Sequence, residues 1–224
     1  MHHSTVPNNR GSDKLPPKPL SYRTFHFAGW LSMLSAFISI PLSYVAYLIE
    51  TRQTDSLVLL GYQLNPEYSN LILTVVQIGG TLLFSAILLY LKTLLSRVLK
   101  FQSVNRNIDL MILANITIGI FSVSSLYLPQ IKEPAGMATL ILTVFMGMVQ
   151  IQFGYKLLRL PITLGGLLKP FCLLNIATGV CEASLVLILV GVVVSAVGDL
   201  MLGTIFFNVS KQLKQLKSVE IAVR

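Results

Sequence analysis

Apolar stretches of about 20 residues are the feature of this sequence that most limits its fold. Four are clear, at residues 27–49, 69–91, 108–128 and 136–155. A helix of that length crosses the hydrocarbon core of a bilayer, which is about 30 Å thick. Inside lipid every backbone polar group needs an internal partner, and a helix supplies one. The sequence therefore predicts an all-α polytopic membrane protein.

The composition excludes the alternative of a soluble globular domain. Of the 224 residues, 54% are hydrophobic and 12% are charged, whereas about a quarter of the residues in an ordinary soluble domain are charged. A water-exposed surface would need more polar side chains, but a helical bundle in lipid does not.

The C-terminal part of the chain contains two further predicted spans. No Lys or Arg occurs between Lys169 and Lys211. As one straight helix this segment would be about 62 Å long, roughly twice the thickness of the core. It must therefore fold back on itself, which predicts a fifth span at 168–189 and a sixth at 192–211, with Gly191 in a very tight turn between them.

The placement of basic residues predicts the orientation of these six spans. Of the 17 Lys and Arg residues, all except Arg52 and Lys132 then lie on one side of the membrane. Positive charge marks the cytoplasmic side, so both termini are expected in the cytoplasm, and a bacterial plasma (inner) membrane is the expected location. The net charge of +8 therefore indicates orientation and no nucleic-acid partner.

A repeated pattern supports consecutive hairpins. The sequence Leu-Ile-Leu-Thr-Val occurs at 71–75 and again at 140–144, and an Asn-Ile-x-x-Gly pattern occurs at 115–119 and 175–179. Self-similarity within a sequence indicates repeated structural units. We expect six transmembrane helices arranged as three consecutive hairpins.

The predicted domain organisation has three parts. Residues 1–24 form a flexible cytoplasmic tail that contains Pro and Lys, residues 25–212 form the transmembrane domain, and residues 213–224 form a basic cytoplasmic tail. The pair His2-His3 is either native or a remnant of cloning.

Two carboxylates, Glu182 and Asp199, fall inside the predicted spans. Acids in a membrane are energetically costly, and they are functional candidates for that reason. Glu182 is 13 residues from Lys169 and Asp199 is 12 from Lys211, so in an antiparallel hairpin the two would reach almost the same depth. With no cation at that depth, we expect one or both to be protonated, or the pair to share a proton.

These acids suggest a candidate proton or cation site, with Asn115 and Asn175 as neutral ligands. The alternative is that each acid hydrogen-bonds to an asparagine or a backbone carbonyl and so fixes helix packing. Gln77 and Gln150 are further polar candidates within the second and fourth spans.

Motifs that would indicate enzymatic activity are absent from the sequence. It has no Walker phosphate loop, dinucleotide glycine fingerprint, His-Glu-x-x-His pattern or Gly-x-Ser-x-Gly elbow. The three histidines, His2, His3 and His26, lie in the tail or at the edge of the first span, which argues against a histidine zinc site or a Ser–His dyad. We therefore predict no catalytic residue, cofactor or metal. Cys172 and Cys181 lie on opposite faces of one helix and cannot pair.

The sequence thus predicts a non-enzymatic structural, accessory or assembly component. Its expected partners are the lipid bilayer and either another membrane protein or a second copy of the chain. The alternative is a small transporter or channel that binds a proton or cation at Glu182 and Asp199. An intramembrane enzyme acting on lipid is the weakest hypothesis, because no nucleophile and base can be paired.

Overall fold

The computed structural model of the protein describes residues 21–51, 57–59, 62–64, 66–160 and 166–222. Within these ranges the regular secondary structure is helical apart from one short strand pair, and turns join the helices. The helices are α1 (Tyr22–Thr51), α2 (Pro66–Thr93), α3 (Asn105–Tyr127), α4 (Lys132–Leu157), α5 (Leu168–Ser184) and α6 (Ile188–Ala222). The strands β1 (Leu57–Leu59) and β2 (Tyr62–Leu64) are antiparallel, with Val58 opposite Gln63.

Five of the helices, α1, α2, α3, α4 and α6, are long and apolar enough to cross a membrane. The remaining helix, α5, has 17 residues and is about 25 Å long. The prediction of an apolar helical protein of the membrane type is therefore confirmed. The helix that corresponds to the fifth predicted span is the shortest of the six.

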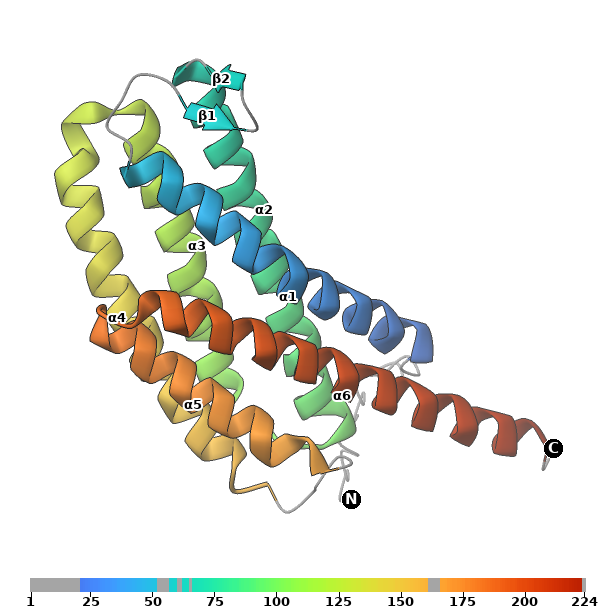
Figure 1. Cartoon of the computed structure of the whole chain (residues 1–224). Coiled ribbons are helices and arrows are strands. Elements are labelled where there is room, and N and C mark those ends of the chain that lie inside the picture. Colours follow the sequence, from blue (N-terminus) through green and yellow to red (C-terminus); the bar gives the residue numbers. More distant parts are fainter. Residues whose placement is uncertain (1–20, 52–56, 60–61, 65, 161–165, 223–224) are drawn as a thin grey trace, which may run out of the picture.

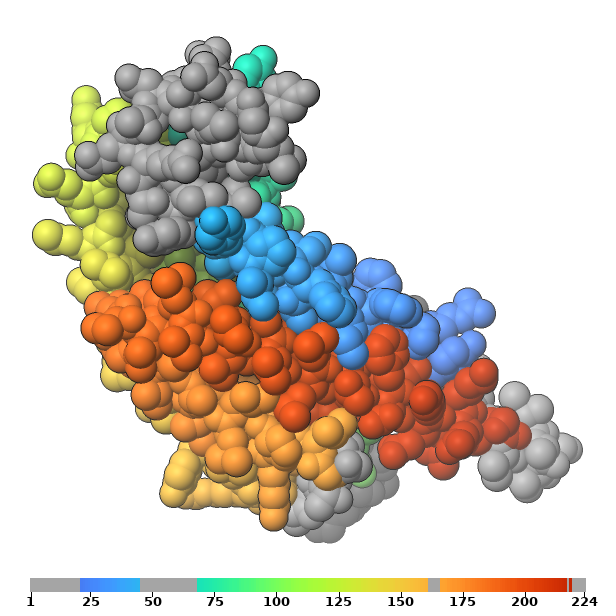
Figure 2. Space-filling model, in the orientation of Figure 1, coloured from blue at the N-terminus to red at the C-terminus, as the bar shows by residue number. Residues whose placement is uncertain are grey.

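The helices form two layers (Figure 1). Helices α2, α3 and α4 stand side by side in chain order, and α1, α6 and α5 cross them obliquely. Helix α6 lies between α1 and α5, as the space-filling view in Figure 2 also shows. The first helix packs more extensively on the last helix than on its neighbour in sequence, α2.

Neighbouring helices are antiparallel, so the basic residues of alternate helix ends meet at one end of the bundle. There, Ser210 Oγ donates a hydrogen bond to the Tyr22 carbonyl at 2.9 Å, and Lys156 Nζ donates to Asn107 Oδ1 at 2.8 Å. We call this the basic end. The Lys and Arg residues of the described chain that lie there are among those expected on the cytoplasmic side.

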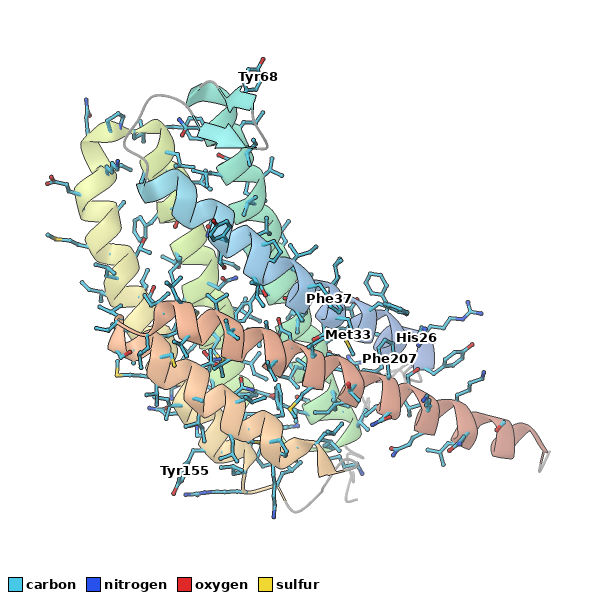
Figure 3. All side chains as sticks on the ribbon, viewed as in Figure 1. His26, Met33, Phe37, Tyr68, Tyr155 and Phe207 are labelled. Atoms are coloured by element: carbon cyan, nitrogen blue, oxygen red, sulfur yellow. The ribbon has the colours of Figure 1, made fainter. Side chains whose placement is uncertain are left out.

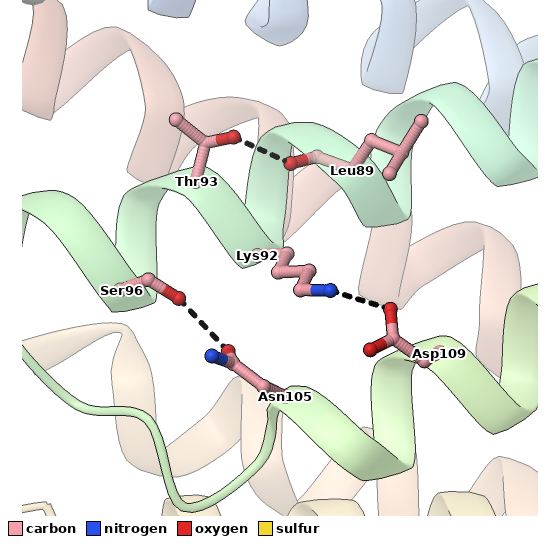
Figure 4. Close-up of polar contacts among 6 residues, drawn as sticks. All are labelled: Leu89, Lys92, Thr93, Ser96, Asn105 and Asp109. Atoms are coloured by element: carbon pink, nitrogen blue, oxygen red, sulfur yellow. Dashed lines mark hydrogen bonds and ion pairs between the residues drawn. The ribbon is translucent and has the colours of Figure 1, made fainter.

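The connection between α2 and α3 at the basic end is held by polar contacts (Figure 4). Lys92 and Asp109 form an ion pair of 2.6 Å, and Ser96 Oγ donates a hydrogen bond to Asn105 Oδ1 at 2.8 Å. Helix α2 continues into a π-helical turn, Leu94–Val98, whose first two residues are buried. These contacts hold α2 and α3 together at the turn that joins them.

The buried apolar core lies in the half of the bundle next to the basic end. It takes side chains from all six helices, and the rings of Phe25 and Phe206 stack across it at a centroid distance of 6.2 Å. The largest fully buried side chains include Phe25, Ile108, Met111, Phe153 and Phe206. The cavity described below borders this core.

The C-terminal hairpin differs from the expected one. Helix α5 ends at Ser184 and α6 begins at Ile188, so Gly191 lies inside α6 and not in the turn. Helix α6 also continues through residues 213–222, the greater part of the predicted C-terminal tail. Most of the predicted N-terminal tail, residues 1–20, lies outside the described residues.

Candidate functional site

Asp199 lies on α6 and is hydrogen-bonded from α1. The hydroxyl of Ser35 donates to Asp199 Oδ2 at 2.7 Å, and the hydroxyl of Ser32 donates to the backbone carbonyl of Asp199 at 2.9 Å. Ser32 is fully buried. The two serines lie on one face of α1 because they are three residues apart. This aspartate therefore links the first and last helices of the chain.

Glycines allow these two helices to approach closely. A Cβ atom placed on Gly203 of α6 would lie 3.1 Å from the carbonyl oxygen of Gly29 of α1, and one placed on Gly29 would lie 2.8 Å from the ring of Phe207. His26 and Met33 on α1 and Phe207 on α6 lie along this seam (Figure 3). The hydroxyls of Ser32 and Ser35 can therefore reach α6 directly.

Asp199 also borders a cavity of about 30 Å³ between the two layers. Five of its lining residues have polar side chains, and they come from three helices: Gln150 of α4, Asn175 and Thr178 of α5, and Ser195 and Asp199 of α6. Apolar side chains of α2 and α3, including Phe84 and Met111, line the other side. A cavity of this size has room for about two water molecules.

The polar groups at the cavity are only partly used in hydrogen bonds. Asn175 Nδ2 donates to the Phe171 carbonyl at 2.9 Å, and the Thr178 hydroxyl donates to the Leu174 carbonyl at 2.9 Å, both within α5. No hydrogen bond joins either Gln150 or the amide oxygen of Asn175 to another described residue. The cavity thus offers amide and carboxyl oxygens of the kind that bind protons or hard cations.

Glu182 has different surroundings. Its Oε2 atom is buried and has no hydrogen-bond partner among the described residues. The residue packs against α4 at Gly147, where an added Cβ would lie 3.2 Å from Glu182 Cβ and 2.6 Å from the carbonyl oxygen of Gly179. Glu182 does not line the cavity that Asp199 borders.

The structure therefore separates the two acids that the sequence analysis paired. A Cβ placed on Gly191 would lie 3.0 Å from Cys181 Cβ. Because α5 and α6 run antiparallel, the next residue of α5, Glu182, lies at the same height as Val190 of α6. Asp199 is nine residues further along α6, or about 13 Å. The predicted equal depth depended on a turn at Gly191. Because the turn comes earlier, at Ser184–Leu187, the register of the hairpin changes.

The two asparagines also lie in different places. Asn175 lines the cavity, whereas Asn115 Nδ2 donates to the Thr81 carbonyl at 3.1 Å and to the Ser85 hydroxyl at 3.3 Å. Asn115 therefore joins α3 to α2 and is not part of the cavity wall. Of the four predicted site residues, the structure brings together Asp199 and Asn175 only.

The serine partners of Asp199 are not among the residues that the sequence predicts for the site. Ser32, Ser35 and Ser39 follow i, i+3, i+7 spacing in the first apolar stretch, which places them on one face of a helix. That spacing predicts a polar face on α1. It did not indicate which helix the face would meet.

No protein-family model, curated protein or solved structure matches this chain. Within the part of the chain that the structure describes, no group of three or more His, Cys, Asp or Glu side chains is arranged to hold a metal ion. Cys172 and Cys181 are buried free thiols.

Proposed function

We propose that this chain is a multi-pass integral membrane protein with a structural role, acting as an accessory or assembly component and not as an enzyme. The observation that carries this proposal is the 2.7 Å hydrogen bond from Ser35 to Asp199. Hydrogen bonds between apolar helices stabilise their association in lipid. Asp199, an acid within an apolar helix, thus joins α1 to α6 and so closes the bundle.

In the proposed topology the helices form three consecutive hairpins. Both termini lie on the cytoplasmic side of a bacterial plasma membrane. The gathering of Lys and Arg at the basic end supports this orientation, because positive residues are retained on the cytoplasmic side. The exposed side chains of Tyr68 and Tyr155 lie at opposite ends of the bundle (Figure 3), as tyrosines do at membrane interfaces.

The proposed internal repeat relates the α2–α3 hairpin to the α4–α5 hairpin. In support, Gly119 of α3 packs on Thr81 of α2, and Gly179 of α5 packs on Gly147 of α4. The corresponding asparagines have diverged, since Asn115 bonds to the neighbouring helix and Asn175 to its own. An assembly role for the bundle implies a membrane-protein partner or a second copy.

The experiment that tests the structural role compares stability with ion flux. The full chain is reconstituted in proteoliposomes as wild type, Asp199→Asn and Glu182→Gln, with Glu133→Gln as a matched control outside the apolar core. We expect proton and cation flux equal to that of protein-free vesicles for every variant. For the stability part of the comparison Asp199→Ala is prepared as a further variant, and we expect it to have a lower midpoint of thermal unfolding than the wild type. Flux above that of protein-free vesicles would contradict the structural role.

A second candidate function is transport of a proton or small cation, and the cavity favours it. Its walls bring the Asp199 carboxyl near the side chains of Gln150 and Asn175 from two other helices. In this case the same experiment gives a different pattern. Flux would be present in the wild type and in Glu133→Gln, lost in Asp199→Asn, and kept in Glu182→Gln, because Glu182 lies outside the cavity.

A further inference from the structure

The turn between α5 and α6 has an unusual surface. From Leu185 to Val194 every residue is apolar or glycine. The side chains are exposed: 90% of the Val186 surface is accessible, and 62% of that of Leu189. The turn between α3 and α4, at the end of the bundle opposite the basic end (Figure 1), instead carries Gln130, Lys132 and Glu133. A turn in contact with water would not present only apolar groups.

Three consecutive backbone amides of this turn have hydrogen-bond partners within the turn itself. The amide of Leu185 donates to the Glu182 carbonyl at 3.3 Å, that of Val186 to the Ser184 carbonyl at 2.6 Å, and that of Leu187 to the Ser184 hydroxyl at 3.4 Å. Leu185 has a φ of 57°, which closes the turn tightly without glycine. Each of these hydrogen bonds lowers the cost of placing non-helical backbone in hydrocarbon, where an unpaired amide has no water to bond to.

The length of α5 agrees with a turn that stays inside the lipid. Its 17 residues give about 25 Å of helix, less than the core thickness of about 30 Å. Helices α5 and α6 also run obliquely to α2, α3 and α4 (Figure 1). The length of α5 measured along the direction of α2, α3 and α4 is therefore shorter still. If Lys169 lies at the headgroups of the basic side, the turn lies within the hydrocarbon.

We propose that α5 and the first turns of α6 form a re-entrant hairpin, whose turn contacts lipid acyl chains and does not reach the opposite membrane surface. This proposal is independent of the structural role proposed above. Both termini still lie on one side of the membrane in this arrangement. A re-entrant hairpin enters and leaves by the same face, so the chain ends on the same side as it would after two complete crossings.

Tryptophan fluorescence tests the proposal, because the chain contains a single tryptophan. In a Trp30→Phe background, Val186→Trp reports on the α5–α6 turn and Gln130→Trp on the α3–α4 turn. Both proteins are reconstituted in phosphatidylcholine vesicles, either plain or brominated along the acyl chain. We expect brominated lipid to remove most of the Val186→Trp fluorescence and aqueous iodide to leave it unchanged. Iodide should quench Gln130→Trp.

Two results would overturn the proposal. Quenching of Val186→Trp by iodide as strong as that of Gln130→Trp would place the turn in water. Protection of Val186→Trp from both quenchers would place it against protein. Leu189→Trp in the same background provides a second reporter if Val186→Trp fails to fold, and the same two results with Leu189→Trp would also overturn the proposal.

Discussion

Glu182 and Asp199 are acids in two consecutive apolar helices, yet their surroundings differ. Asp199 accepts a hydrogen bond from a serine 164 positions earlier in the chain and borders a polar cavity. Glu182 lies in the last turn of α5, beside a glycine of α4, and its Oε2 atom has no partner in the described part of the protein. The apolar sequence around an acid therefore does not reveal whether it is used in packing.

The difference follows from the residues on the opposing helix. At Asp199 the neighbour, α1, presents hydroxyl groups. At Glu182 the neighbour, α4, presents Gly147, which allows close approach but supplies no side-chain donor. A buried polar group without a partner lowers stability, whereas a bonded one is close to neutral or favourable. We therefore expect opposite effects when the two acids are replaced by apolar residues.

The largest effect is expected where α4 meets α5 beside Glu182. Gly147→Leu would force a side chain into the backbone of Gly179 and Ala183, where even a Cβ would lie at 2.6 and 2.8 Å. We expect a loss of about 3 kcal/mol in the free energy of unfolding, typical of severe overpacking. Unfolding of the purified protein in mixed micelles, titrated with a denaturing detergent, measures it.

Gly136→Leu is the control for this change, because an added Cβ at Gly136 meets no atom within 4 Å. We expect its stability to remain near that of the wild type. Equal losses for Gly147→Leu and Gly136→Leu would show that close packing at the Glu182 end is not what holds α4 and α5 together.

A smaller effect is expected at Asp199. Asp199→Ala removes the acceptor of the Ser35 hydroxyl and leaves that donor unpaired beside α6, so we expect a loss of about 2 kcal/mol. Asp199→Asn keeps an oxygen that can accept the same hydrogen bond, and its loss should be below about 1 kcal/mol. The same unfolding titration measures both variants, and a greater loss for asparagine than for alanine would contradict this account.

The smallest effect is expected at Glu182, with the opposite sign. Glu182→Leu replaces an unpartnered buried carboxyl oxygen by an apolar side chain of similar size. We expect the free energy of unfolding to rise by about 1 kcal/mol. The midpoint of thermal unfolding in detergent is a suitable measurement. A fall comparable to that of Asp199→Ala would mean that Glu182 has a stabilising partner, and the contrast between the two acids would fail.

The helical content and the gathering of cations could be predicted because both depend on local sequence. The apolar stretches correspond to α1, α2, α3 and α4 within a few residues at most ends, although each helix begins before its predicted limit. Charged residues stand at helix ends, so antiparallel packing is enough to collect them at the basic end.

The position of the α5–α6 turn could not be predicted from the sequence. Gly191 is the only glycine in the segment 180–197, and a tight turn was expected there. The chain turns instead at Leu185, whose positive φ is uncommon for a side-chain-bearing residue. Gly191 is used for close packing against Cys181. Since the turn sets the register, this shift moved Glu182 and Asp199 to different depths.

The partner of Asp199 was also beyond sequence analysis, for a different reason. Consecutive hairpins imply that α1 packs chiefly on α2, but its most extensive contact is with α6. The serines of α1 and the acid of α6 each have a recognisable spacing within their own helix. Which helical faces meet depends on tertiary packing, and a single sequence does not encode that in any local pattern.

A double-mutant cycle on Ser35 and Asp199 tests most directly the claim that this aspartate fastens α1 to α6. The free energy of unfolding is measured in the same micelles for wild type, Ser35→Ala, Asp199→Ala and the double variant. If the hydrogen bond stabilises the bundle, the two changes are not additive, and the coupling energy is about 1 kcal/mol, within the range found between membrane helices. A coupling energy of zero, with the double variant losing the sum of the two single losses, would contradict the claim.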